Sequence, residues 1–569
     1  MFVSRGDFRV WDGATIIKTT DQRLPRGEVF ADSLGLAMAA AFIVWYCATI
    51  IGTYKLHASQ VSDSVGYYTV SRTLLKTGHI DGHIIYPSTL YQNAPKNYLY
   101  MPGFYWCLAA TFKVLGAGVK QGLVLNGVCL GAAAIATYAL GRRYFSRGVA
   151  LLAAGLLLMS PANHYFGATL MMEICLLAAT TIAIAVFAYV PRRWMIPAGP
   201  MLLIAPFLIR ETNAFLVLPM LAMLVDRCRR EGVNRSATLV RAAGLATASV
   251  LVLGLVYISP VSAGRPSLWT LGVFHPWSSG STVYRDAMAG RNLHPTLSEW
   301  RHALASRFAV NLHLMIDGMT SKPFRYTTAV LYPTLINIPL GFWAWARRGD
   351  PLALGGALLV LVIVLLTLLL HMGLPYHMTH MTMFIAPFTA LLLASTWDGI
   401  AQRWLVRLPG AMRAWPGALL AMVLAFVALR QTYISLHEMM WRDGPDAADT
   451  ELLGRLRIDN RSTIVAPYPL AMDYLAIHWT LKYSFPPANR GTLDLLCTKY
   501  PVSLYIYDPK DAMDILPQDV LDQGLRPFCH LQAEGSDYVV YRRPLHPGEE
   551  LSWHPERIER SASDTVRSP

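Results

Sequence analysis

The sequence predicts a polytopic α-helical membrane protein that also carries a small α/β domain, and three observations support this fold class. Only 15% of the 569 residues are charged, whereas soluble globular domains have about 25%. Hydrophobic residues make up 54% of the chain and gather in runs such as 239–258 and 352–370, near the roughly 20 residues that a helix needs to cross about 30 Å of hydrocarbon. Arginines cluster between these runs, so the net charge of +13 reports membrane topology and not a nucleic-acid partner.

We expect about eleven spans, because each long apolar run is of crossing length. Residues 1–32 are polar and show no signal-peptide pattern, so they are expected to form a cytoplasmic segment. With the N-terminus inside, Arg pairs such as Arg142 and Arg143 fall in the cytoplasm, as the positive-inside rule requires. The protein is therefore expected in the inner (plasma) membrane as a multi-pass protein. The expected spans are 33–54, 119–140, 148–161, 168–190, 194–209, 212–226, 239–258, 326–345, 352–370, 379–396 and 415–434.

Residues 101–115 are also apolar but fit a full crossing poorly. The run is short and contains Pro102, Gly103 and Lys113, which favours an interfacial or re-entrant helix. The alternative, a further span here, would place 55–100 in the cytoplasm.

The spans form a membrane domain over 33–434. The residues after this domain have a different, less apolar composition. Two large outer loops are expected at 55–118 and 259–325. Residues 462–467, 502–507 and 538–542 are typical of strands, and 471–481 and 518–523 are typical of helices. We therefore expect an extracytoplasmic α/β domain over 435–545, in which Cys497 and Cys529 could pair, and a disordered polar tail over 546–569.

The first outer loop contains a helix-like segment at 61–78 with an acidic residue at its start. Val61, Val65, Tyr68 and Leu75 share one stripe, so the helix is expected to lie along the membrane surface with Asp63 at its N-terminal end. A carboxylate there can accept a proton from an acceptor hydroxyl or amine. The alternative is that Asp63 only stabilises the helix N-terminus.

Two further charges lie within or between apolar runs near the outer face. Glu173 interrupts the run 168–190, where an ionisable group is costly and usually has a partner or meets water; the alternative is a snorkelling or neutral Glu. Arg210 stands apart from the cytoplasmic Arg clusters and could stabilise a phosphate. Its alternative role is pairing with the adjacent Glu211.

Several further residues are candidates for contacting substrate. His371, His377 and His380 share an outer turn with Tyr376, but no carboxylate or Cys stands near them, so no metal site is expected. Donor contact and a structural role remain open for this turn. The other candidate substrate contacts are Tyr67 and Tyr100.

The order of these features resembles the GT-C class of polyprenyl-phosphate-sugar glycosyltransferases. The features are Asp63 with its Tyr-rich helix after the first span, the segment 98–106, and a span that ends in Arg142 and Arg143. The chain looks most like the branch of protein O-mannosyltransferases and lipid A aminoarabinose transferases. The Pro-Pro pair common in the second motif is replaced here by Met101 and Pro102, which leaves the subfamily open.

The resemblance implies a catalytic site and a reaction. Asp63 matches the acidic residue that acts as base, Glu173 matches a second acid, and Lys96 lies where a lysine contacts the donor phosphate; the alternative for Lys96 is an ordinary surface residue. The implied reaction is an inverting transfer of a sugar from a polyprenyl-phosphate donor to an acceptor at the outer face of the membrane. Metal independence is expected, although a divalent metal stays open. Lipid A, another glycolipid, a glycan and a protein are all open as acceptors.

Two functions of other classes compete with this hypothesis. A secondary transporter would also be polytopic, but the sequence shows no internal repeat. A non-catalytic envelope-assembly protein would not need Asp63 or Glu173.

Overall fold

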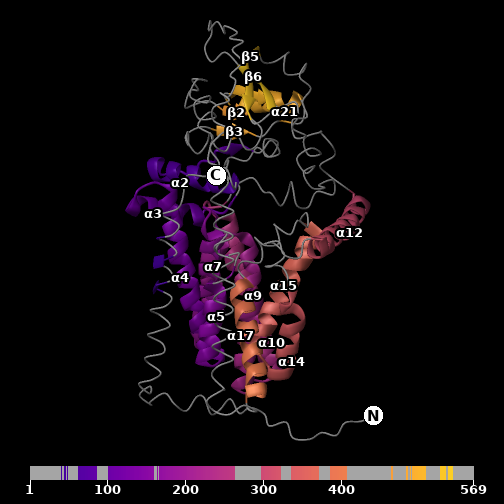
Figure 1. The fold of residues 1–569 in the computed structure, drawn as a ribbon. Helices are drawn as coiled ribbons and strands as arrows, with labels where there is room; N and C mark the ends of the chain where they lie inside the picture. The colour runs from indigo at the N-terminus through magenta and orange to yellow at the C-terminus, as the bar shows by residue number, and fades with distance from the viewer. Residues whose placement is uncertain are drawn as a thin grey trace.

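The computed structural model describes two sets of elements, a helical bundle and a mixed sheet at one end of it (Figure 1). The described residues are 62–85, 100–158, 166–262, 296–321, 335–370, 385–405, 463–465, 482–484, 490–500, 502–507, 526–533 and 536–542, with isolated positions between them. The helices are α2 (Ser62–Thr77), α3 (Gly103–Leu115), α4 (Val119–Tyr144), α5 (Arg147–Leu158), α7 (Glu173–Tyr189), α8 (Arg192–Ile209), α9 (Val217–Arg230), α10 (Arg235–Ile258), α12 (Leu297–Ser321), α14 (Asn337–Arg348), α15 (Pro351–Leu370), α17 (Ala386–Leu405) and α21 (Arg490–Lys499), with the 3-10 helix η4 (Glu211–Leu216).

The bundle agrees with the expected membrane domain. Among the described residues, α4, α10 and α15 are long and apolar enough to cross a membrane, by length and composition. Nine of the expected spans overlap a described helix, whereas 33–54 and 415–434 lie wholly or mostly outside the described residues. The count of eleven therefore stays a prediction.

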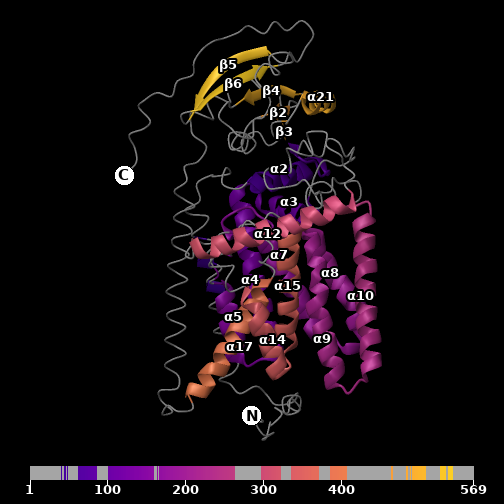
Figure 2. The same cartoon turned by 90° about the vertical axis from the view of Figure 1, so that its right-hand side faces the viewer.

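The segment at 101–115 is a short helix, as expected. At 13 residues, α3 is about 20 Å long, too short to cross about 30 Å of hydrocarbon. It lies below α2 at the end of the bundle that carries the sheet (Figures 1 and 2). The structure also contains α12 in the outer loop 259–325, where the sequence indicated no element.

The sheet has six strands in the order β1-β3-β2-β4-β6-β5. The strands are β1 (Ile84–Ile85), β2 (Thr463–Val465), β3 (Lys482–Ser484), β4 (Val502–Tyr507), β5 (Arg526–Ala533) and β6 (Ser536–Arg542). Strands β2 and β4 fall in two of the segments that the sequence predicts, 462–467 and 502–507, and β6 overlaps the third, 538–542. The expected helices at 471–481 and 518–523 and the tail over 546–569 lie outside the described residues, and the disulfide between Cys497 and Cys529 stays a prediction.

One strand of this sheet comes from the segment 55–118, which the sequence predicts to be the first outer loop. Strand β1 pairs in parallel with β3, with Ile84 opposite Tyr483 and Ile85 opposite Ser484. The sheet and the loop that carries Asp63 therefore form one structural unit, which the expected division at residue 435 does not anticipate.

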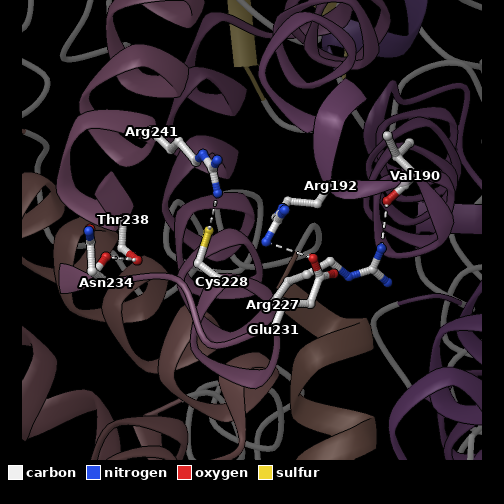
Figure 3. A network of polar contacts seen from close by, with 8 residues as sticks. All are labelled: Val190, Arg192, Arg227, Cys228, Glu231, Asn234, Thr238 and Arg241. Carbon is white, nitrogen blue, oxygen red and sulfur yellow. Dashed lines mark hydrogen bonds and ion pairs between the residues drawn. The ribbon is translucent and has the colours of Figure 1, made fainter. Parts of the chain in front are cut away.

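A polar network ties two turns at the opposite end of the bundle (Figure 3). The guanidinium of Arg227 donates to the carbonyl oxygens of Val190 at 2.9 Å and Ala188 at 3.4 Å, and Arg192 pairs with Glu231 at 2.8 Å. These contacts hold the α7–α8 connection against the end of α9. The expected cytoplasmic Arg clusters thus include side chains that fix helix ends.

Candidate functional site

The helix α2 confirms the expected helix at 61–78, and its expected position along the membrane surface stays a prediction. Val65, Tyr67 and Val70 are at most 3% exposed, while Leu75, which shares the expected apolar stripe with Val65, is 38% exposed. Most of residues 64–73 are buried, because α3 lies below α2 (Figure 1) and the side chain of Ile84 in β1 lies close to Gly66. Asp63 lies in the first turn of this helix.

Tyr67 joins α2 to the start of α3 through an aromatic cluster. Its ring centroid lies 5.4 Å from that of Tyr100, 5.0 Å from Phe104 in an edge-to-face arrangement, and 5.7 Å from Tyr105. Such pairs add about 0.5–1.5 kcal/mol each beyond area burial. Tyr67 is 1% exposed, so its described role is to fix α2 on α3, and substrate contact by Tyr67 or Tyr100 stays a prediction.

The start of α3 in turn approaches the end of α8 backbone to backbone. A Cβ on Gly103 would lie 2.7 Å from the carbonyl oxygen of Leu208 and 3.1 Å from the nitrogen of Ile209. Glycine is therefore required for this approach. It places the segment 100–105 beside the residue that follows Ile209, which is Arg210.

Arg210 leaves the helical path at the end of α8. Its backbone is extended, with φ −153° and ψ 129°, and Asn213, which is fully buried, donates from Nδ2 to the carbonyl oxygens of Pro206 and Arg210 at 2.8 and 2.9 Å. These bonds satisfy carbonyls at the helix end. They also hold the chain in the extended conformation that ends α8 at Arg210.

Glu173 lies in the first turn of α7, and the turn before it is also clamped by a buried amide. Asn126 of α4 donates from Nδ2 to the carbonyl oxygens of Phe166, Gly167 and Thr169, at 3.4, 3.1 and 2.7 Å. A carboxylate in the first turn is favoured by the partial positive charge of a helix N-terminus. The Glu173 side chain is 1% exposed, so it does not snorkel to the surface.

Arg210 and Glu173 form an ion pair. Nη1 of Arg210 lies 3.4 Å from Oε1 of Glu173, and the Arg210 side chain is 19% exposed. A buried acid is thus paired with a cation that still reaches a partly open environment. This arrangement can orient an acceptor group through Glu173 and can stabilise a departing phosphate through Arg210.

The other candidates are placed less completely. Asp63 has a described backbone only, and Lys96, His371, Tyr376, His377 and His380 lie outside the described residues. Within the described part of the chain, no group of three or more His, Cys, Asp or Glu side chains could hold a metal ion. The sequence analysis did not single out Asn126 or Asn213, although an amide inside an apolar run is a signal that could have found both.

Comparisons with known proteins agree with the expected class. The family model described as dolichyl-phosphate-mannose-protein mannosyltransferase matches residues 95–261, a stretch that includes Glu173 and Arg210 but not Asp63. A comparison with curated protein sequences found no match.

Solved structures show the fold. ArnT from Cupriavidus metallidurans bound to undecaprenyl phosphate is 14% identical with a TM-score of 0.50, covering 89% of this chain and 97% of that one. Its apo form is 13% identical with a TM-score of 0.50, covering 90% and 98%. The archaeal oligosaccharyltransferase AglB from Archaeoglobus fulgidus, in complex with an inhibitory peptide and a dolichol-phosphate, is 12% identical with a TM-score of 0.49, covering 83% and 69%. The two ArnT structures confirm the fold that the resemblance implies.

Proposed function

We propose that this protein is a membrane glycosyltransferase that moves a sugar from a polyprenyl-phosphate donor to an acceptor at the outer face of the membrane. The observation that best supports this proposal is the ion pair at 3.4 Å between the buried Glu173 and the partly exposed Arg210, which lies beside the segment 100–105 at the sheet end of the bundle. The matching family model and the GT-C fold support the same reaction class.

In the proposed reaction, Asp63 accepts the proton of the acceptor hydroxyl or amine. The acceptor atom forms a bond to the anomeric carbon from the face opposite the phosphate, so the configuration inverts. The bond from that carbon to the phosphate oxygen breaks, and its electron pair stays on the phosphate, where Arg210 and Lys96 stabilise the negative charge. Glu173 orients the acceptor and fixes Arg210.

The deciding experiment compares wild-type chain and Asp63→Asn in membranes supplied with labelled polyprenyl-phosphate mannose or polyprenyl-phosphate aminoarabinose. We expect label to pass to an envelope acceptor only with the wild-type chain. Full transfer by Asp63→Asn would remove Asp63 from the reaction, and no transfer from any polyprenyl-phosphate sugar would favour a transporter or a scaffold.

A further inference from the structure

Strand β1 connects the first outer loop to a strand almost four hundred residues later in the chain. The carbonyl oxygen of His83 accepts a hydrogen bond from the backbone N–H of Tyr483 at 2.7 Å. Beside it, Nζ of Lys482 lies 3.1 Å from Oδ1 of Asp81, across a sequence separation of 401 residues. The loop segment 81–85 is therefore held by the C-terminal strands.

The same segment also contacts α2 through side chains. A hydrogen bond of 2.8 Å joins Nε2 of His83 to Oγ1 of Thr73, and these residues are 3% and 9% exposed. The Ile84 side chain lies so close to Gly66 that a Cβ there would be 3.2 Å from its Cδ1. His83 thus binds β3 with its backbone and α2 with its ring.

The position of α2 matters for the proposed chemistry. Asp63 lies in the first turn of α2, three residues before Gly66 and ten before Thr73. Tyr67 holds one face of α2 against α3. The hydrogen bond between Thr73 and His83 holds a second face of α2 against the segment 81–85. A reacting group that shifts by about 1 Å from its productive position can lose a hundredfold in rate.

We propose that His83 is a positioning residue that makes the C-terminal sheet part of the transfer site, by holding the Asp63 helix between that sheet and α3. This inference rests on the proposed function. The proposed reaction does not by itself involve the C-terminal strands. The inference gives these strands the role of holding α2 in position.

The chain offers a matched pair of variants on one helix. Thr73→Val removes the hydroxyl that bonds to His83 and keeps the side-chain shape. Thr69→Val makes the same change one turn earlier, where, among the described residues, the buried hydroxyl donates to the carbonyl oxygens of Val65 and Gly66 in its own helix. Thr73→Ser keeps the hydroxyl.

Two measurements on the full-length chain test the proposal. The first is hydrogen–deuterium exchange of residues 62–77 in purified protein, and the second is the rate of sugar transfer with its kcat and donor KM. For Thr73→Val we expect faster exchange of α2 and a kcat about tenfold lower, with donor KM unchanged. Thr69→Val and Thr73→Ser should stay near wild type in both measurements.

The outcomes separate this inference from the proposed function. Equal exchange in Thr73→Val and Thr69→Val overturns the coupling between α2 and the sheet, whatever the protein catalyses. Faster exchange with unchanged kcat overturns the positioning role. Should Thr73→Val fail to fold, His83→Gln, which retains a polar partner for Thr73, should keep transfer near wild type while His83→Phe loses it; equal transfer by the two variants overturns the proposal. The proposed function itself fails only if the wild-type chain transfers no sugar; full transfer by Asp63→Asn would overturn the role of Asp63 as the base and not the transfer reaction.

Discussion

Glu173 and Arg210 form an ion pair of 3.4 Å although 37 residues separate them in the chain. Each side chain depends on a local break in helical structure: Glu173 follows the turn clamped by Asn126, and Arg210 leaves α8 at the site clamped by Asn213. The pair is therefore built by backbone geometry as well as by charge. A structural role and a role in transfer make different predictions for it.

A double-mutant cycle separates those two roles. Glu173→Gln or Arg210→Gln alone removes the ion pair and keeps one of its two charges, and we expect each variant to lower the free energy of unfolding by about 3 kcal/mol. The double variant removes both charges and should recover most of this loss. Sugar transfer should be lost in all three variants, measured alongside thermal unfolding in detergent. Transfer restored in the double variant would mean that the pair serves stability only.

The approach of α3 to α8 provides a second prediction. Gly103→Ala places a methyl group 2.7 Å from the carbonyl oxygen of Leu208, so α3 or the end of α8 must shift. We expect a loss of about 1–3 kcal/mol in the free energy of unfolding and about a tenfold lower transfer rate, because Arg210 follows that helix end.

The control for this variant is Gly155→Ala in α5, where no atom of the described residues lies within 4 Å of the added Cβ. Alanine is a better helix former than glycine by up to about 1 kcal/mol, so this variant should be neutral or more stable. Equal transfer rates for the two variants would show that the contact of α3 with α8 does not position Arg210.

The sequence predicts the charged residues of the site better than it predicts their contacts. Glu173 and Arg210 are each conspicuous because a charge beside apolar runs is costly. Their partnership is invisible in the chain, since nothing local links α7 to the end of α8. Asp63 was placed on the correct helix, because its segment has helical periodicity over four turns.

The burial of α2 could not be predicted from that periodicity. A two-residue strand such as Ile84–Ile85 has no pattern to read, and its partner Tyr483 lies in a distant part of the sequence. The helix was therefore assigned one apolar stripe, while the structure covers a second face with His83 and Ile84. The pairing of strands that lie far apart in the chain cannot be predicted from the residue pattern of a single sequence.

Asp350, between α14 and α15, predicts a pH dependence of stability. Its Oδ1 accepts hydrogen bonds from the backbone nitrogens of Leu352 and Ala353 at 3.0 and 3.2 Å, but burial dominates and raises the pKa of its carboxyl to about 6. Because the folded chain holds this proton more tightly than the unfolded chain, stability falls as pH rises from about 4 to about 6 and is then constant.

The variant Asp350→Asn keeps an acceptor for the helix start and removes the titration. Relative to wild type it should gain up to about 3 kcal/mol between pH 4 and pH 7, seen as a growing difference in Tm in detergent. The comparison with wild type at each pH cancels the other carboxylates. A difference in Tm that is the same at both ends of this range would contradict the assignment.

The polar network at the far end of the bundle predicts a loss of stability without a loss of chemistry. Arg227→Gln removes the charged donor to the carbonyl oxygen of Val190 (Figure 3) and to that of Ala188, both at the end of α7. This loss should cost about 1–3 kcal/mol of unfolding free energy. The control is Arg229→Gln, an exposed residue of the same helix turn. Glu173 is at the opposite end of α7, which has 17 residues and a length of about 25 Å. The transfer rate per folded molecule should therefore equal that of wild type in both variants; a lower rate in Arg227→Gln alone would mean that α7 transmits a change at one end to the charge pair at the other.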